Sequence, residues 1–290
     1  MFRKGLGSDS TFSDYHPACN LIYFAFVIGI AMFSNRPCFV TASFLAAFMY
    51  STLLGGIKQI KMNLLLSIPV TVLMTCINAL FTHNGATVLF YINGGRITLE
   101  AIVFGLAASG ILISVVIWFT CFGKTISADK LIYIFGKAVP VIGLTLSMIF
   151  RFIPLLKERY REIRMGQKAM GRNKGFRQTM KELSILVSWS LEASIETADS
   201  MESRGYGLKG RSSFHLFRIT RRDRVFMAFT LLAGGLSSAA CIMGRTDIYY
   251  YPEIRGGNMD MFTYLSFAAY IILMLLPAAI DIYGERKWQK

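Results

Sequence analysis

Long stretches of apolar residues, each close to the length of a membrane-spanning helix, alternate with short polar segments along this chain of 290 residues. A bilayer core about 30 Å thick needs roughly 20 mostly apolar residues in helical form. Six stretches meet this requirement: 18–35, 38–55, 63–82, 101–123, 225–243 and 262–283. Only the letters NRPC separate the first two, which predicts a tight helical hairpin. The pattern predicts an all-α integral membrane protein with about six spans.

Residues 124–224, between the fourth and fifth spans, follow a different pattern. Residues 138–156 are apolar but carry Arg151 in their middle and prolines at positions 140 and 154. Proline removes a backbone donor and kinks a helix. We therefore expect this segment to lie at the cytoplasmic boundary of the membrane, or to dip into it, rather than to cross it.

Two amphipathic helices are predicted in the rest of this region. In the first, Arg161, Arg164 and Lys168 recur at helical spacing and form a basic stripe. This helix is expected to stop at Gly171, since glycine turns the chain at a helix end without strain. The second helix is expected to end at Gly205 in the same way.

The second amphipathic helix carries two neighbouring stripes. The acidic stripe consists of Glu192, Glu196 and Asp199, and the apolar stripe consists of Leu183, Val187, Leu191, Ile195 and Ala198. The acidic stripe is predicted to face the basic stripe of the first helix. The apolar stripe fits lipid, the neighbouring helix or a partner protein, and the sequence leaves these three open.

Charge is scarce and unevenly distributed. Charged residues make up 17% of the chain, against about 25% in a typical soluble domain. Of the 31 basic residues, 20 lie in residues 124–224. Because Lys and Arg accumulate in cytoplasmic loops, this region and both termini are predicted to be cytoplasmic. In a membrane protein such an excess of positive charge reflects orientation, so no nucleic-acid partner is expected.

The pattern predicts three parts along the chain. Residues 1–123 form an N-terminal membrane part with four spans. Residues 124–224 form a cytoplasmic or interfacial region of amphipathic helices, and residues 225–290 form a C-terminal membrane part with two spans.

Candidate catalytic and ligand-binding residues are few. The spans hold almost no ionisable side chains, and Asp281 stands at the end of the sixth. Ion-coupled carriers usually keep such groups inside the bundle, so a secondary transporter or channel subunit is the less favoured alternative. An intramembrane enzyme would need a catalytic constellation inside the spans, and none is found. The five cysteines and three histidines show no metal-ligand spacing, and no metal, cofactor or catalytic residue is expected.

One short motif resembles a nucleotide site without meeting its requirements. The letters FGKT at 122–125 look like the end of a P-loop, but Trp118 stands where that loop requires glycine. If ATP drives this protein, another subunit is expected to bind it.

Four stretches carry a family resemblance. They are HPACNLIYFAF at 16–26, FTHNGATVLFYINGGRITLEAIVFGL at 81–106, LSMIFRFIPLLKERYREIRMGQKAMG at 146–171 and ADSMESRGYG at 198–207. Together they resemble the transmembrane T component of energy-coupling factor (ECF) transporters, the family that includes the cobalt-transport subunit CbiQ. The likeness covers about residues 15–225, and the last stretch is similar to the family motif A-M-E-A-R-G-Y.

The resemblance implies a non-enzymatic subunit of an importer in the inner (cytoplasmic) membrane of a prokaryote. In this family two coupling helices end in arginine motifs that dock on two ABC-type ATPase subunits. They transmit ATP-driven motion to a small substrate-binding membrane subunit, which selects the vitamin or transition metal. The candidate ATPase-coupling residues are Ala169, Gly171, Arg172, Ser203, Arg204 and Gly205, with Arg151, Pro154, Met201 and Glu202 in the helices that carry them.

The chain departs from the family pattern in both motifs. Met170 stands at the position of the first arginine, and Arg172 follows two residues later. On a continuing helix Arg172 would point about 200° away from that position, whereas after a turn at Gly171 it could reach the same partner; both possibilities stay open. Ser203 replaces an alanine of the second motif, a change between small residues that is expected to be harmless.

Overall fold

The computed structural model describes residues 10–82, 85–92, 95–138, 140–171, 175–207, 219–252, 255–256 and 260–288. The chain divides into two compact units. Residues 1–128 together with 217–290 form the first, here called the bundle unit. Residues 129–216 form the second, here called the hairpin unit. The predicted division into residues 1–123, 124–224 and 225–290 stays a prediction.

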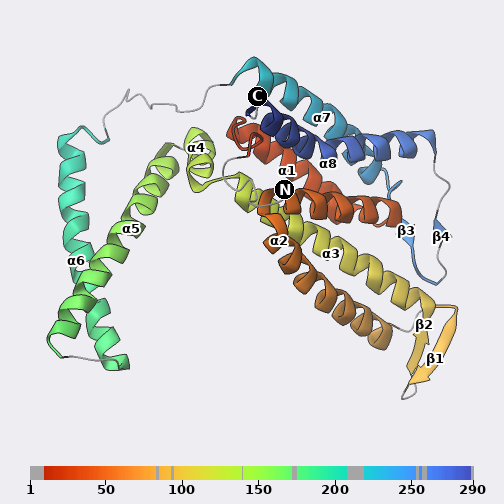
Figure 1. Cartoon of the computed structure of the whole chain (residues 1–290), viewed down its shortest axis with the longest axis horizontal. Helices are drawn as coiled ribbons and strands as arrows, with labels where there is room; N and C mark the ends of the chain where they lie inside the picture. The colour runs from red at the N-terminus through yellow and green to blue at the C-terminus, as the bar shows by residue number, and fades with distance from the viewer. Residues whose placement is uncertain are drawn as a thin grey trace. The chain divides into compact units, whose positions relative to one another are not determined.

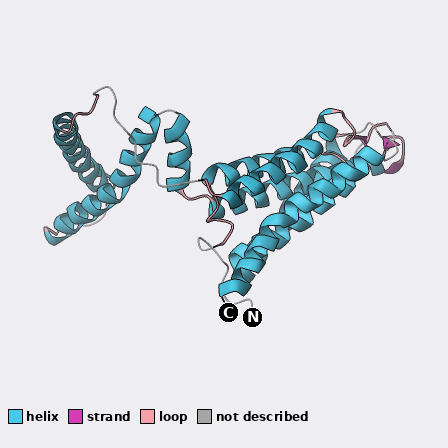
Figure 2. Cartoon of the chain, turned by 90° about the horizontal axis from the view of Figure 1, so that it is seen from above, coloured by secondary structure: helices cyan, strands magenta, loops and turns pink. Residues whose placement is uncertain are grey.

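Five helices make up the described part of the bundle unit (Figure 1). They are α1 (Pro17–Phe33), α2 (Pro37–Phe81), α3 (Leu99–Thr125), α7 (Arg221–Ile242) and α8 (Met261–Trp288). Two short antiparallel hairpins join them: β1 (Val88–Ile92) with β2 (Gly95–Thr98), and β3 (Ile248–Tyr249) with β4 (Arg255–Gly256). Figure 2 shows these strands gathered at one end of the helices. The sequence pattern predicted loops there and gave no sign of the strands.

Helix α2 folds back on itself at Gly56. This residue has φ 65° and ψ −162°, a conformation that glycine adopts without a steric penalty. Asn63 Nδ2 donates to Ser51 Oγ over 3.0 Å, although twelve residues of straight helix would separate them by about 18 Å. The two halves of α2 therefore form a V (Figure 1), as the second and third apolar stretches predicted.

A chain of polar side chains closes the V of α2 against the end of α3. Lys124 Nζ donates to Gln59 Oε1 (2.8 Å), and Gln59 Nε2 donates to Asn63 Oδ1 (3.0 Å). Asn63 then donates to Ser51, as described above. Because Gln59, Asn63 and Ser51 are buried, each hydrogen bond avoids the cost of an unpaired polar group away from water.

Residues 10–16, here called the N-terminal latch, occupy the core at the same end of the bundle unit. Phe12 is 0% exposed and contacts five aromatic rings, those of Tyr15, Tyr23, Phe24, Tyr50 and Phe226. The Phe12 backbone N–H donates to Asp281 Oδ1 over 2.7 Å, and Ser13 Oγ donates to the Thr125 carbonyl over 3.0 Å. The latch therefore joins α1, α2, α3, α7 and α8.

The latch also contacts the first turn of α7. Thr220 and Asp223 form a capping box, in which the Thr220 N–H donates to Asp223 Oδ2 over 2.9 Å. The other carboxylate oxygen of Asp223 accepts from the His16 N–H over 3.3 Å. One carboxylate thus fixes both the start of α7 and the approach to α1.

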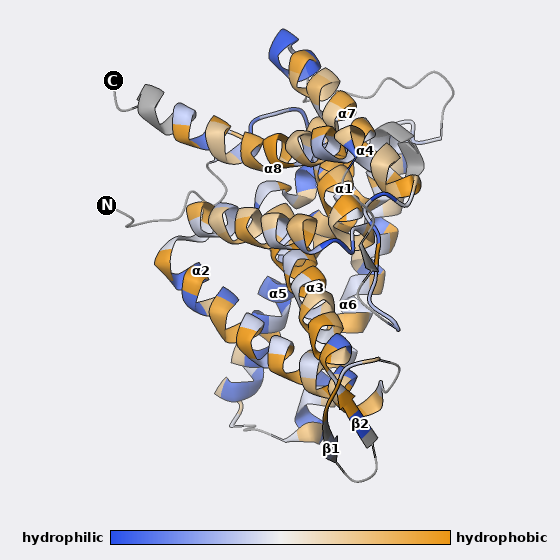
Figure 3. Ribbon diagram, turned by 90° about the vertical axis from the view of Figure 1, so that its right-hand side faces the viewer, coloured by the Kyte–Doolittle hydropathy of each residue, from blue (hydrophilic) through white to orange (hydrophobic). Residues whose placement is uncertain are grey.

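The composition of the bundle helices is that of a membrane protein. Helices α2, α3, α7 and α8 are long and apolar enough to cross a bilayer, and α1 is a shorter apolar helix of 17 residues. In Figure 3 apolar residues predominate along α2 and α3. The expectation of an all-α membrane protein is confirmed, whereas the total of six crossings stays a prediction.

The hairpin unit contains α4 (Ala128–Ala138), α5 (Pro140–Ala169) and α6 (Phe176–Ser203). Gly136 and Gly143 allow the backbones of α4 and α5 to approach closely. Helix α5 continues through Pro154, so residues 140–156 of the predicted segment and the basic stripe belong to one helix rather than two. The sequence pattern did not predict α4.

Candidate functional site

Helix α6 ends in a closed cap built around a left-handed glycine. Arg204 is the C-cap residue, and Gly205 follows it with φ 78°. The Gly205 N–H donates to the Glu202 carbonyl (2.9 Å), and the Tyr206 N–H donates to the Met201 carbonyl (3.0 Å). This pair of bonds is the Schellman motif, which satisfies the last carbonyls of a helix. Met201 and Glu202 therefore contribute their carbonyls to the cap.

The cap presents Arg204 to solvent. Its side chain is exposed, and within the part of the chain that the structure describes, no hydrogen bond or ion pair of the Arg204 side chain is found. The neighbouring hydroxyl, Ser203 Oγ, donates to the Ser200 carbonyl over 2.9 Å and not to the Arg204 side chain. Tyr206 is 46% exposed beside it. A planar guanidinium held at a rigid helix end can make several hydrogen bonds to a partner's carboxylates or carbonyls.

Helix α5 ends in a similar turn with a different side chain. Ala169 is its last residue, Met170 is 62% exposed, and Gly171 has φ 72°. The Gly171 N–H donates to the Lys168 carbonyl over 3.0 Å. The predicted helix stops at Gly171 and Gly205 are therefore both confirmed. Arg172, the proposed substitute for the missing arginine, lies outside the described residues.

Helices α5 and α6 pack as an antiparallel pair. Near the connecting turn, Gln178 Nε2 donates to Gln167 Oε1 over 2.9 Å. Farther along, the rings of Phe152 and Trp189 stack with an interplanar angle of 4° and centroids 6.2 Å apart. The guanidinium carbon of Arg159 lies 5.2 Å from the centre of the Trp189 ring.

This register contradicts the prediction that the charged stripes face each other. The basic stripe, 161–168, lies between Arg159 and the connecting turn, around the Gln167 contact. The acidic stripe, 192–199, lies beyond Trp189, toward the opposite end of the pair. The sequence showed two complementary stripes, but aromatic and amide contacts across the helices set the register, and these placed the stripes at opposite ends.

The apolar stripe of α6 is exposed. Leu191 is 63% exposed and Ile195 is 64% exposed, and Leu183, Val187 and Ala198 are also classed as exposed. The helix therefore does not bury this stripe against α5. Arg151, which is exposed, and Pro154 both lie within α5, the helix that carries the first motif. Both are more than ten residues before the end of that helix at Ala169.

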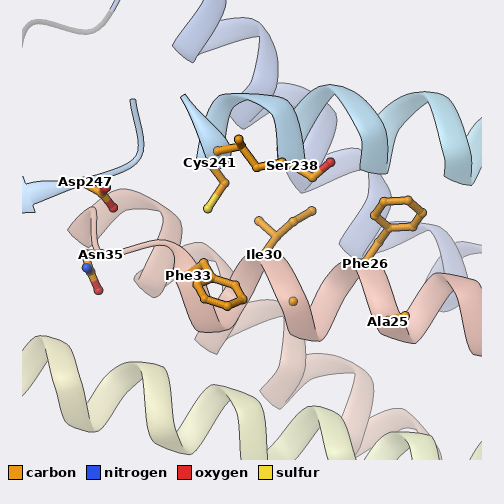
Figure 4. Close-up of a pocket in the computed structure, with 10 residues that line it drawn as sticks. Ala25, Phe26, Ile30, Phe33, Asn35, Ser238, Cys241 and Asp247 are labelled. Carbon is orange, nitrogen blue, oxygen red and sulfur yellow. The ribbon is translucent and has the colours of Figure 1, made fainter. Parts of the chain in front are cut away.

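The bundle unit contains a separate groove between α1 and α7. Its volume is about 610 Å³, and Phe26, Gly29 and Ile30 of α1 face Ser238 and Cys241 of α7. Figure 4 shows Asn35 and Asp247 at one end and Ala25 and Phe26 toward the other. Apolar groups thus line most of the groove, and polar groups gather at one mouth.

The described residues contain no group of three or more His, Cys, Asp or Glu side chains placed to hold a metal ion. All five cysteines are free thiols, and Cys19 and Cys121 are buried. The candidate functional site among the described residues is the arginine-bearing cap at the end of α6.

The helices that are long and apolar enough to cross a bilayer define a multi-pass helical membrane protein, and a second unit contains a pair of glycine-capped helices. Residues 9–216 match the family model described as CbiQ, cobalt transport protein. The chain belongs to this family, which confirms the resemblance to the T component of ECF transporters. The match includes the whole hairpin unit and ends before α7.

Two curated relatives, which share one name with each other, are similar to parts of this chain. The energy-coupling factor transporter transmembrane protein EcfT of Lactobacillus helveticus is 29% identical over 175 residues, which cover 51% of this chain and 63% of the relative. The protein of that name from Bacillus selenitireducens is 32% identical over 111 residues, covering 36% of this chain and 41% of the relative. The alignments thus span less than two thirds of each relative's length.

Proposed function

We propose that this chain is the transmembrane coupling subunit of an ECF-type importer. It would transmit ATP-driven motion from two ABC-type ATPase subunits to a small substrate-binding membrane subunit for vitamin or transition-metal uptake. ATP hydrolysis would take place on the partner subunits. The observation that carries the proposal is the rigid, solvent-exposed Arg204 cap at the end of α6, in a chain of the CbiQ family.

The two helix ends are proposed as the ATPase docking points. Arg204, with Ser203 and Gly205, would enter a groove on one ATPase, where its planar fork would bond to carboxylates or carbonyls. The end of α5 at Ala169, Met170 and Gly171 would contact the other, with Arg172 close by in sequence. Since Met170 offers no charge, the two contacts are expected to differ in strength.

Affinity purification tests this proposal. The tagged wild-type chain, extracted in mild detergent from the membranes of its own host, should bring down two ABC ATPases and a small membrane protein. Arg204→Ala should lose the ATPases, because truncating one partner of a buried charged contact costs about 2–5 kcal/mol. Arg164→Ala, an exposed arginine in the body of α5, is the matched control and should retain them.

Two results would count against the coupling role. A wild-type chain that is purified without any ATPase would favour a secondary transporter or channel subunit. Arg204→Ala that retains both ATPases would reduce Arg204 to a helix-end cation that the helix dipole favours.

We also infer that the hairpin unit and both termini are cytoplasmic. Lys58 and Lys61 follow the bend of α2, and Lys124 bonds to Gln59 at the same end of the bundle unit. The basic end of a membrane bundle faces the cytoplasm. In a cysteine-free background, a membrane-impermeant maleimide should label Gly256→Cys from outside intact cells and leave Lys209→Cys unlabelled; equal labelling would reject this orientation.

A further inference from the structure

The contact between α5 and α6 includes a stack, formed by Trp189, Phe152 and Arg159, that the sequence pattern did not indicate. Trp189 of α6 lies against the Phe152 ring, and the Arg159 guanidinium lies over the Trp189 ring. Arg159 Nη1 is also paired with Glu162 Oε2 over 2.7 Å. The ion pair restricts the Arg159 side chain on its own helix, so the guanidinium is held over the Trp189 ring. Tryptophan is the aromatic side chain that attracts cations most strongly.

Of the described contacts between α5 and α6, the stack lies farther from the connecting turn than the hydrogen bond between Gln178 and Gln167. The Gln178–Gln167 hydrogen bond lies near the turn, and Phe152 lies fifteen residues earlier on α5, about 22 Å along the helix. Two contacts separated in this way prevent the helices from rotating about either one. With only the contact near the turn, the rest of the pair would be free to splay.

Helix α6 continues beyond the stack as a free arm. Arg204 follows Trp189 by fifteen residues, so the docking cap is about 22 Å beyond the stack. The arm between them exposes its apolar stripe, including Leu191 and Ile195. A change of about 10° in the angle at the stack would move the cap by about 4 Å relative to α5 over this length.

We propose that Phe152, Trp189 and Arg159 are positioning residues that make α5 and α6 one rigid lever. The stack holds the α6 arm at a fixed angle to α5, so that motion at the Arg204 cap is passed to α5 rather than lost in bending. This inference rests on the proposed coupling function. It adds to that function a residue, Trp189, that acts through the helix pair rather than by binding a partner.

The first test measures the angle in the chain alone. Spin labels at Ile149→Cys and Ser200→Cys lie on α5 and α6, beyond the stack from the turn, in a cysteine-free chain reconstituted in lipid nanodiscs. The wild-type background should give a narrow distance distribution between the labels. Trp189→Ala should broaden it by about twofold or more, because the packed contact that fixes the angle is gone. An unchanged distribution would overturn the proposal.

Two further variants separate the stack from general effects on α6. Leu191→Ala removes an apolar side chain of the same helix that is exposed, and it should leave the distribution unchanged. Trp189→Phe keeps a ring against Phe152 and under Arg159, and it should restore most of the narrow distribution. If Leu191→Ala broadens the distribution as much as Trp189→Ala, the stack has no special role.

The second test uses the assembled transporter. Trp189→Ala should still bind the ATPases, since Arg204 and its cap are intact, but uptake per ATP hydrolysed should fall by about tenfold because the lever bends. Loss of ATPase binding, or normal uptake, would overturn the positioning role. If the wild-type chain binds no ATPase at all, the proposed function fails, and the distance measurement alone still decides whether the stack fixes the angle.

Discussion

The bundle unit has a core of fully buried large side chains, and helix α6 of the hairpin unit has none among its described residues. In the bundle unit, Phe12, Tyr23, Tyr50 and Trp118 are fully buried against one another and their neighbours. In α6 of the hairpin unit, Glu182 is the buried residue among those described, and the apolar stripe is exposed. A unit that buries its own aromatic residues is stabilised by internal contacts, whereas a helix that exposes an apolar stripe is built to meet lipid or another protein.

Polar groups show the same contrast. The carboxylates of Asp281 and Asp223 in the bundle unit accept backbone N–H bonds from the N-terminal latch. Arg204 in the hairpin unit is held by a rigid cap and exposes its guanidinium. The comparison indicates that bundle substitutions should act on stability and hairpin substitutions should act on assembly.

The largest effect is expected in the latch. Phe12→Ala removes a fully buried ring and should lower the free energy of unfolding by about 3–5 kcal/mol. Thermal unfolding of the two proteins in detergent measures this loss of stability. Leu191→Ala, which removes an exposed side chain of α6, should change stability by no more than about 0.5 kcal/mol; similar losses in both variants would remove the contrast between the units.

A smaller loss in the free energy of unfolding is expected when the buried carboxylate of Asp281 is removed. Asp281→Ala leaves the Phe12 N–H without its acceptor at 2.7 Å and should cost about 3 kcal/mol. The matched control is Asp260→Ala, whose carboxylate pairs with Arg245 in a partly exposed ion pair and should contribute about 0–1 kcal/mol. Equal melting temperatures for the two variants would show that the latch contact is not structural.

The smallest effect on folding, but a specific one on assembly, is expected at the cap. Gly205→Ala places a side chain at φ 78° and should strain the cap by about 1–2 kcal/mol. If Arg204 docks, ATPase affinity should fall by about 5- to 30-fold. Gly166→Ala, within α5 and with open space around an added Cβ, is the glycine control and should leave affinity unchanged. Equal affinities for both variants would separate the cap from docking.

Local sequence signals predicted most of the helices and both glycine stops. The first apolar stretch, predicted over 18–35, corresponds to α1 at Pro17–Phe33, and Gly171 and Gly205 end their helices with positive φ. These features depend on hydropathy and on the conformational freedom of glycine, which single residues report. Arg204 was identified from its motif, and the structure adds the cap that holds it.

Contacts between distant residues were not predicted. The latch brings Phe12 to Asp281 across nearly the whole chain, and nothing near either residue indicates the other. The charged stripes suggested a facing pair, but the register follows the Phe152–Trp189 stack and the Gln167–Gln178 hydrogen bond instead. Exposed ion pairs contribute about 0–1 kcal/mol each, too little to determine how two helices pack.

The central claim is that the Arg204 cap touches an ATPase subunit, and a photo-crosslink tests it most directly. Replacing Tyr206, which is exposed beside Arg204, with p-benzoyl-phenylalanine keeps an aromatic side chain at the cap and leaves the arginine in place. Tyr264 of α8, also exposed, is the matched aromatic control. Illumination of the complex in membranes should crosslink position 206 to an ABC ATPase and leave position 264 without that product. A position 206 that crosslinks only to lipid, or to no ATPase while the ATPases are bound, would contradict the account.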